Sequence, residues 1–317
     1  MSITIHDLAK IAGVNSSTVS RALRNDPCVR QATRERIQAL AVRYGYTPNL
    51  NARNLADGKT RMIAFMMGSL DYQLECDAAV VLNEIFSRHG YTLMIFSYAP
   101  DVERFYLDRL EKFSQKICDG AILLAPGYRL QSPRLLSVLQ SVRIPLVCLD
   151  RWFDGIRLPV VTTDNSVAVR ELFEAAYKAG MDAAICNFHC NDSTSAGRRR
   201  EFERCFAEKQ FPFLMPERPE EIPLFLQKNH SVRPAVLSNS SRDFTEWLPF
   251  LPAGFITAAF DRGVPPQREL YGPIILCVQN YREIARQGAQ IMLNLLKQEP
   301  SVPDDPVLIE PETILYV

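Results

Sequence analysis

The chain has 317 residues, 47% of them hydrophobic and 23% charged, a composition typical of globular proteins that argues against intrinsic disorder. The first 30 residues lack the apolar core of a signal peptide, and no apolar run approaches the roughly 18 to 20 residues that span a bilayer, so we expect a cytoplasmic protein with no membrane partner. The 36 Lys and Arg balance the 36 Asp and Glu, so only the distribution of charge is informative.

The two ends of the chain differ in charge. The first 60 residues carry nine Lys and Arg and four acids, a net charge of 9 − 4 = +5, so the remainder sums to 27 − 32 = −5. A basic segment suits a polyanion such as DNA, because each neutralised phosphate releases condensed counterions. The N-terminal segment is therefore a candidate nucleic-acid-binding domain.

Three short helices are predicted in residues 1–46. Thr4 is a good N-cap for a first helix that ends at Gly13, a residue suited to the left-handed position after a helix. Asn15 can cap a second helix, and a third is predicted at about 32–44. Two short helices joined by a glycine-containing turn are typical of the helix-turn-helix, whose second helix enters the DNA major groove.

The outer face of the second helix is polar at its start and basic at its end. We expect Ser16, Ser17 and Arg21 to contact bases. Arg24 is expected to contact a phosphate. The predicted DNA-binding residues of this domain are Asn15, Ser16, Ser17, Thr18, Arg21 and Arg24.

Three segments, Ile5–Val14, Ser17–Leu23 and Tyr44–Asn49, resemble the start of lactose-repressor-type (LacI/GalR) transcription regulators. The resemblance implies a helix-turn-helix domain that binds operator DNA. Two residues depart from the family pattern: Arg24 stands where Asn is usual, and Arg30 where a capping Ser is usual. The departures predict a poorly capped third helix, stronger phosphate binding and an operator sequence of this chain's own.

Residues 47–60 are predicted to form a hinge, with a helix of about eight residues after Pro48. Isolated helices shorter than about 12 to 15 residues are marginal in water, so we expect this one to form only when DNA and a partner hinge hold it. The resemblance implies hinge-helix positions for Asn49, Ala52, Arg53 and Leu55, with Arg53 on a phosphate and Leu55 wedged between base pairs in the minor groove. The alternative is a plain interdomain linker.

Residues 61–317 alternate short apolar runs with amphipathic stretches, the rhythm of parallel sheets covered by helices on both faces. The predicted fold class is α/β, with the helix-turn-helix domain and hinge followed by a two-lobed, periplasmic-binding-protein-like body of doubly wound parallel sheets. We assign residues 61–317 to effector binding and dimerisation. Lobe 1 is predicted at about 61–161 plus 279–300, and lobe 2 at about 162–278 plus 301–317. The predicted strands are Met62–Met67, Leu93–Phe96, Ala121–Leu124 and Leu146–Leu149, then Val160–Thr162, Ala183–Phe188, Ala235–Leu237, Phe255–Phe260 and Ile274–Val278.

The body resembles the sugar-binding module of the same family in four ordered segments, Ile144–Arg151, Val160–Asn165, Gly197–Phe202 and Phe260–Asp261. The resemblance implies cleft positions for Asp150, Arg198, Asn239 and Asp261, residue types that bind sugar hydroxyls in pairs. Tyr72 is the candidate for stacking on a sugar ring. Segments 71–74 and 211–234 depart from the family pattern, so the effector's identity, and whether one exists, stays open.

No catalytic motif is found: the sequence has no GxSxG, GxxxxGK[ST], HExxH or GxGxxG, and its four histidines have no motif partners. We therefore expect no enzyme and no cofactor. The cluster from Cys186 to Cys190 lacks a standard metal-ligand spacing, so no metal site is predicted.

We expect a sequence-specific DNA-binding transcriptional regulator, a repressor that binds a palindromic operator as a homodimer. A small-molecule effector, a sugar or sugar derivative, would control it from the cleft between the lobes. Two alternatives stay open: a sugar-binding receptor and a DNA-binding regulator that needs no effector. The sequence does not distinguish inducer from corepressor or dimer from higher oligomer.

We predict that Leu55→Ala lowers operator affinity much more than it lowers thermal stability, because a wedge residue acts by unstacking and bending DNA. Titration of labelled operator gives the affinity, and calorimetry gives the melting temperature. Equal operator affinity of the variant and the natural protein would remove the wedge role from Leu55.

Overall fold

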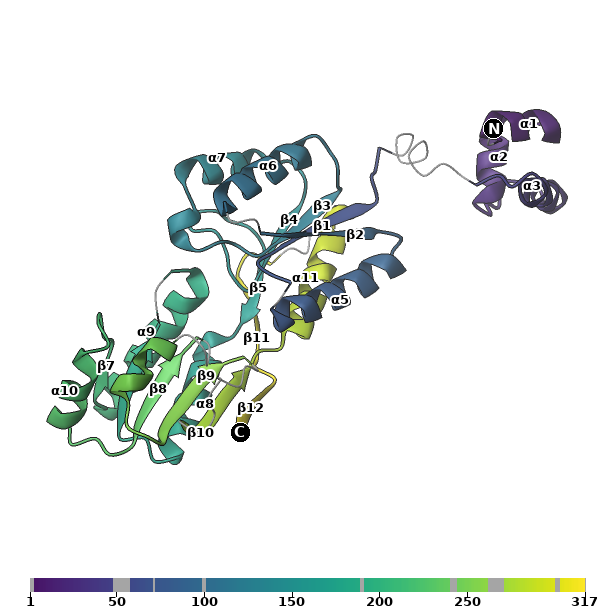
Figure 1. Ribbon diagram of the computed structural model, residues 1–317. Coiled ribbons are helices and arrows are strands. Elements are labelled where there is room, and N and C mark those ends of the chain that lie inside the picture. Colours follow the sequence, from purple (N-terminus) through teal and green to yellow (C-terminus); the bar gives the residue numbers. More distant parts are fainter. Residues whose placement is uncertain are drawn as a thin grey trace. The chain divides into compact units, whose positions relative to one another are not determined.

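The computed structural model describes residues 3–47, 58–70, 72–98, 101–188, 191–239, 244–261, 271–299 and 303–316. The chain forms two compact units, Met1–Thr60 and Arg61–Val317 (Figure 1). The predicted hinge residues Asn49, Ala52, Arg53 and Leu55 lie outside the described residues.

The N-terminal unit contains helices α1 (Ile5–Ala12), α2 (Ser16–Leu23) and α3 (Gln31–Arg43). Thr4 caps α1 as predicted, and the cap is reciprocal: the backbone N–H of Asp7 donates to the Thr4 hydroxyl, and the backbone N–H of Thr4 donates to the Asp7 carboxylate. Gly13 follows at φ 62°, the predicted left-handed position. Both ends of α1 are thus fixed by local sequence.

A small apolar core holds the three helices together. Leu8 of α1, Val19 and Ala22 of α2 and Ile37 of α3 are fully buried in it. The outer faces of the helices are exposed and mostly polar, although Ile11 and Val42 are also exposed there. Arg30 lies at the N-cap of α3 without a side-chain cap, which confirms the predicted weak start of that helix.

The first lobe of the body is built on a six-stranded parallel sheet with strand order β11-β5-β4-β3-β1-β2. Helices α5 and α11 cover one face, and α6 and α7 cover the other (Figure 1). Alternate residues of β1 therefore enter different cores, Phe65 with α5 and Met66 with α6. The elements are β1 (Met62–Met67), α5 (Gln73–Arg88), β2 (Thr92–Ser97), α6 (Val102–Ser114), β3 (Gly120–Leu123), α7 (Pro133–Ser141), β4 (Leu146–Leu149), β5 (Val160–Thr163), α11 (Tyr281–Leu296) and β11 (Val307–Ile309).

The second lobe repeats this plan with strand order β12-β10-β9-β8-β6-β7, in which only β12 runs antiparallel to its neighbour. Helices α8 and α9 share a core on one face of the sheet, and α10 packs on the other. The elements are α8 (Asn165–Lys178), β6 (Ala183–Asn187), α9 (Ser193–Lys209), β7 (Phe213–Leu214), α10 (Glu221–Lys228), β8 (Pro234–Ser238), β9 (Phe255–Phe260), β10 (Tyr271–Val278) and β12 (Thr313–Tyr316).

The chain crosses between the lobes three times, after β5, after β10 and after β11. Hydrogen bonds connect the crossings: Asp164 N donates to Ile309 O at 2.8 Å, and Glu312 N donates to Val278 O at 2.7 Å. The Thr163 hydroxyl donates to the Gln279 side chain at 2.8 Å. The three crossings therefore form one connected hinge at the base of the lobes.

The strands at this hinge correct the lobe boundaries drawn from the sequence. Val160–Thr163 all belong to the first sheet, whereas the prediction divided this strand between the lobes at residue 161. The tail 301–317 was assigned to the second lobe as a whole, but Val307–Ile309 pair with β5 in the first sheet. Short strands that each add one edge to a different sheet have no separate sequence pattern, so the assignment failed there.

Two sheets, the first parallel and the second parallel except for β12, are each covered by helices on both faces and confirm the predicted fold class. Within the described part of the chain, no helix is long and apolar enough to cross a membrane.

Candidate functional site

A cavity of about 330 Å³ opens at the carboxyl ends of the strands of both sheets. This edge is where open α/β sheets bind ligands. Residues from both lobes line it: Gly68, Ser69, Tyr72, Glu75, Asp150, Arg151, Asp192, Thr194, Ser195, Arg198, Asn239, Asp261, Gln279 and Tyr281. All five residues predicted to bind an effector, Tyr72, Asp150, Arg198, Asn239 and Asp261, are among them.

Arg198, on α9, is the centre of the polar contacts on the second-lobe side and is only 4% exposed. Its Nε donates to Asn165 Oδ1 at 2.9 Å, its Nη1 to Asn239 Oδ1 at 3.2 Å and its Nη2 to Gln279 Oε1 at 2.7 Å. The guanidinium also lies 3.6 Å from the centroid of the Phe260 ring. The buried charge is thus held by side chains from three different segments.

Gln279 also binds Asp261: its Nε2 donates to Asp261 Oδ1 at 2.7 Å. The other Asp261 oxygen accepts a short hydrogen bond from the Tyr72 hydroxyl, which comes from the first lobe. Burial raises the pKa of Asp261, while the Arg198 charge and these hydrogen bonds oppose the increase. Tyr72 therefore connects the two lobes across the cavity, and its predicted stacking role stays a prediction.

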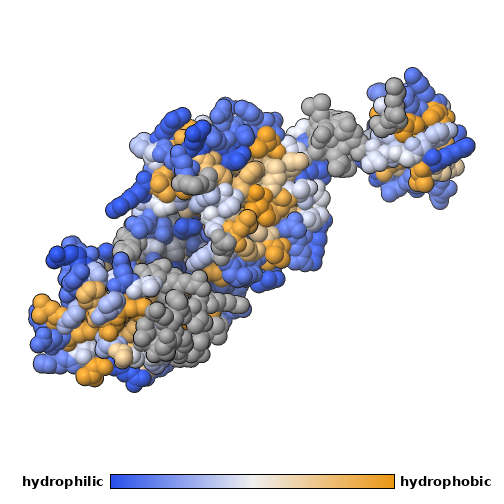
Figure 2. All heavy atoms as spheres, in the orientation of Figure 1, coloured by the Kyte–Doolittle hydropathy of each residue, from blue (hydrophilic) through white to orange (hydrophobic). Residues whose placement is uncertain are grey.

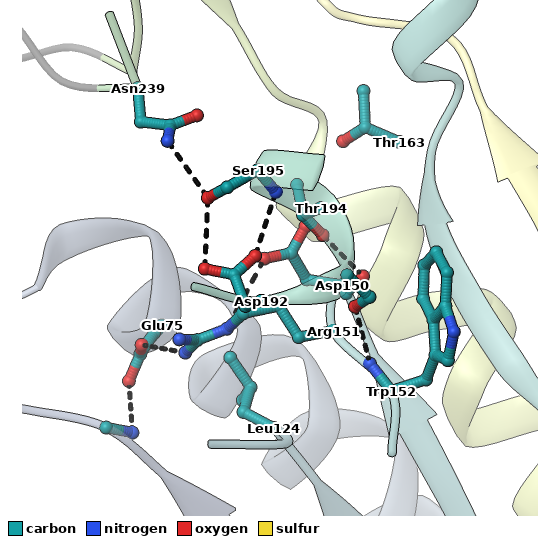
Figure 3. A network of polar contacts seen from close by, with 12 residues as sticks. Glu75, Leu124, Asp150, Arg151, Trp152, Thr163, Asp192, Thr194, Ser195 and Asn239 are labelled. Atoms are coloured by element: carbon teal, nitrogen blue, oxygen red, sulfur yellow. Dashed lines mark hydrogen bonds and ion pairs between the residues drawn. The ribbon is translucent and has the colours of Figure 1, made fainter. Parts of the chain in front are cut away.

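Glu75 and Arg151 order the first-lobe wall (Figure 3). Glu75 Oε2 accepts the backbone N–H groups of Gly68 and Ser69 at 2.6 and 3.0 Å, and its Oε1 lies 3.8 Å from Arg151 Nη2. Burial raises the pKa of Glu75, and the two backbone donors and Arg151 oppose the increase. Arg151 Nε also lies 3.9 Å from Asp150 Oδ2.

The start of α9 joins the lobes on another side of the cavity (Figure 3). Thr194 Oγ1 donates to the backbone carbonyl of Asp150 at 3.0 Å, and Trp152 N donates to Ser193 Oγ at 3.1 Å. Asn239 Nδ2 donates to Ser195 Oγ at 2.9 Å. The first two contacts connect the loop after β4 with the second lobe, and the third lies within that lobe.

Asp150 differs from the other carboxylates of the cavity. It is 6% exposed, and its Oδ1 is buried without a hydrogen-bond partner among the described residues. Its backbone has φ 60°, and Asp261, at the matching strand of the other sheet, has φ 74°. Left-handed backbone is uncommon for residues other than glycine, and such strained positions cluster at functional sites.

Sequence reasoning missed several lining residues, chiefly Glu75, Arg151 and Gln279. Arg151 is the second residue after β4 and Gln279 is the first after β10, so their place at a strand end was an available signal. Glu75 gave none, since an acid in the first turn of a helix is ordinary. Among the described residues no group of His, Cys, Asp or Glu could hold a metal ion, and His189 and Cys190 of the cysteine cluster lie outside them.

A second candidate surface is the outer face of α2. Asn15, Ser17, Arg21 and Arg24 are exposed, while Ser16 and Thr18 are half-buried. Asn15 occupies the N-cap position of α2 as predicted, but its side chain makes no capping hydrogen bond. Arg24 Nε donates to the Ser20 carbonyl at 3.3 Å. The predicted DNA-binding residues of this unit thus lie together on one short helix, and their contacts with DNA stay a prediction.

Comparison with known proteins relates the N-terminal unit to a family of regulatory proteins. Residues 4–49 match the model of bacterial regulatory proteins of the lacI family. The transcriptional regulator KdgR of Bacillus subtilis is 28% identical over 180 residues, which are 56% of this chain and 51% of KdgR. TreR of Escherichia coli is 29% identical over 215 residues, 66% of this chain and 65% of TreR. The chain thus spans between about half and two thirds of these curated relatives.

Solved structures extend the similarity of fold to the whole chain. The lac repressor dimer bound to operator and the anti-inducer ONPF superposes with a TM-score of 0.74 at 16% identity, covering 100% of this chain and 98% of that one. The transcriptional regulator CelR in complex with cellobiose superposes with a TM-score of 0.62 at 16% identity, covering 99% and 98%. The chain therefore has the lac repressor fold.

We predict that Arg198→Lys lowers the free energy of unfolding of the body by about 3 kcal/mol, because a lysine has no planar fork to reach three amide oxygens and leaves buried acceptors unpaired. Urea denaturation followed by circular dichroism measures the change. Arg199→Lys is the matched control, since the neighbouring side chain is 40% exposed and pairs with Glu203 at the surface. Equal destabilisation by the two substitutions would contradict the central role of Arg198.

Proposed function

We propose that this chain, whose residues 4–49 match the lacI family of bacterial regulatory proteins, is a member of that family and a sequence-specific transcriptional regulator, a repressor that binds a palindromic operator as a homodimer. The observation that carries the proposal is α2, a short helix in a helix-turn-helix whose exposed face presents Ser17 and Arg21 beside the basic Arg24. A recognition helix with these side chains offers hydrogen bonds to base edges in the major groove.

The charge distribution supports the same proposal. The net charge of +5 in the first 60 residues lies in the unit that contains α2, while the body is acidic. Contacts with DNA phosphates add affinity whatever the base sequence. Because the body is negatively charged and repels phosphates, DNA binding is favoured at the N-terminal unit alone. A regulator of this kind would act in the cytoplasm, where the bacterial chromosome lies.

We infer that a small molecule, a sugar or sugar derivative, binds in the cavity of the body and controls DNA binding. The polar lining from both lobes supports this, as does the connected hinge at their base. A ligand with higher affinity for one arrangement of the lobes shifts the population toward it, and that shift would alter DNA affinity.

Two other functions receive less support. Catalysis is disfavoured because the relatives KdgR and TreR are transcriptional regulators and the sequence lacks a catalytic motif. A sugar-binding receptor would explain the body, but not the basic head that matches the lacI model. Detection of the protein outside the cytoplasm would favour the receptor.

Exposed apolar residues on the first lobe support a homodimer formed through the body. Leu70, Val80 and Ile95 are 63%, 58% and 45% exposed. They belong to the loop before α5, to α5 itself and to the edge strand β2, and Figure 2 shows apolar residues gathered over this part of the lobe. A two-fold dimer would bury this patch against its own copy and present two heads to two operator half-sites.

We predict that Arg21→Ala weakens binding to a selected operator by about 10- to 100-fold and relaxes its sequence preference, since one good base contact contributes about 1 to 3 kcal/mol of discrimination. Fluorescence titrations with selected and random duplexes over a range of salt measure both effects. In the contrasting variant Arg24→Ala, binding to both duplexes should weaken equally, with a shallower salt dependence. Equal losses on selected and random DNA for Arg21→Ala would exclude Arg21 from base recognition.

We predict that Val80→Glu converts the dimer to a monomer at micromolar concentration, because a charge placed in an apolar interface is desolvated without a partner. Sedimentation velocity measures the oligomeric state, and operator affinity should fall at least tenfold with it. Leu224→Glu, at a 70% exposed position on α10 of the second lobe, is the control and should stay dimeric. A dimeric Val80→Glu variant would place the interface elsewhere.

A further inference from the structure

Two places in the cavity that could receive an anion are already occupied by carboxylates of the chain. The adjacent N–H groups of Gly68 and Ser69 both donate to Glu75. At the start of α9, where the helix carries partial positive charge, the N–H of Ser195 donates to Asp192 Oδ1 at 2.9 Å. A phosphate or carboxylate entering the cavity would have to displace one of these internal anions.

The two arginines of the lining are also engaged. Arg151 lies between the carboxylates of Glu75 and Asp150, at 3.8 and 3.9 Å. All three nitrogens of Arg198 donate to neutral amide oxygens, and one of these amides, Gln279, also donates to the carboxylate of Asp261. Arg151 therefore lies between two acids, and the donors of Arg198 are used by amides while its charge lowers the pKa of the nearby Asp261.

The formal charge of the lining is negative. It contains two arginines and four acids, so 2 − 4 = −2. Burial raises the pKa of both Glu75 and Asp261, which indicates that negative charge is costly at this place. A further negative charge at the same place would add repulsion at low dielectric constant.

Asp150 indicates what the cavity can accept. Its buried Oδ1 has no hydrogen-bond partner in the described structure, and an unpaired buried acceptor costs about 1 to 3 kcal/mol. Because Asp150 lines the cavity, a ligand hydroxyl would donate to its carboxylate, and Asn239 and Ser195 belong to the same lining. The phosphate or carboxylate group of an anionic sugar gains nothing from this acceptor, because two negative groups repel each other. Its hydroxyls donate as those of a neutral sugar do, so the rejection of anions rests on the charge of the lining.

Resting on the proposed function, we infer that the effector is an uncharged polyhydroxyl compound of about monosaccharide size, and that the site rejects phosphorylated and carboxylated sugars. The cavity of about 330 Å³ lies at the lower end of the range of roughly 300 to 1,000 Å³ found for ligand pockets. The selectivity against anions comes from the carboxylates of Glu75 and Asp192, which occupy the anion-binding places. Asp150 is left as an acceptor for ligand hydroxyls.

The test uses the full chain and a panel of hexoses in the gluco, galacto, manno and fructo series. Each is supplied as the free sugar, as the matching polyol, as the phosphate and, for the aldoses, as the uronate. Thermal shift identifies binders, and calorimetric titration gives their affinities. We expect at least one uncharged compound to raise the melting temperature by about 5 °C at 100-fold excess over its Kd. We also expect its anionic counterparts to bind at least tenfold more weakly.

Asp150→Asn tests the acceptor and should weaken binding of the uncharged compound at least tenfold. Asp154→Asn is the control, because it removes the same charge from an exposed position on the same loop and should leave the affinity unchanged. Tighter binding of a phosphate or uronate than of its neutral parent, or binding by no uncharged compound in the panel, overturns the inference. Operator binding by the unliganded chain is measured separately, so a failure of the ligand class and a failure of the regulator are distinguishable.

Discussion

The body depends on one buried cation. Arg198 is almost fully removed from water, and a charge in that position is tolerated only when its donors are paired. Its partners come from the start of α8, from the segment after β8 and from the crossing after β10. Because these segments are far apart in sequence, their meeting at one guanidinium fixes the relative position of three strand ends, and that edge is the floor of the cavity.

The partner Gln279 gives this arrangement a mechanical consequence. It lies at a crossing between the lobes, accepts from Thr163 at the neighbouring crossing and from Arg198, and donates to Asp261. Asp261 in turn accepts from Tyr72 of the opposite lobe. A molecule that rearranges the polar groups of the cavity therefore acts on the same hydrogen bonds that hold the hinge. No separate pathway is needed to connect occupancy of the cavity with the angle between the lobes.

Local sequence was sufficient to predict the three helices of the N-terminal unit. There, Thr4, Gly13 and the apolar spacing determine the fold through contacts between near neighbours. In the body, apolar runs located most strands. Asp150, Arg198, Asn239 and Asp261, the cleft residues that the resemblance implied, line one cavity, and their binding of an effector stays a prediction. The sequence did not predict features that depend on distant contacts. The strands β11 and β12 are a few residues each, and their positions are determined by the sheets with which they pair. The inward direction of Glu75 likewise depends on the loop at Gly68 and Ser69, which no periodicity encodes.

The late position of α11 and β11 in the chain affects when the first lobe can fold during synthesis on the ribosome. The first lobe begins at β1, yet its sheet is covered on one face by α11 and completed at one edge by β11, near the end of the chain. Until synthesis has passed residue 296, a face built around Phe65 and Leu149 has no helix α11 to shield it, and the edge formed by β11 is missing until residue 309. Nascent chains expose such apolar surface while later segments are still being made, which invites aggregation. The first lobe to be translated is thus among the last to mature, and truncation near the C-terminus would damage both lobes at once.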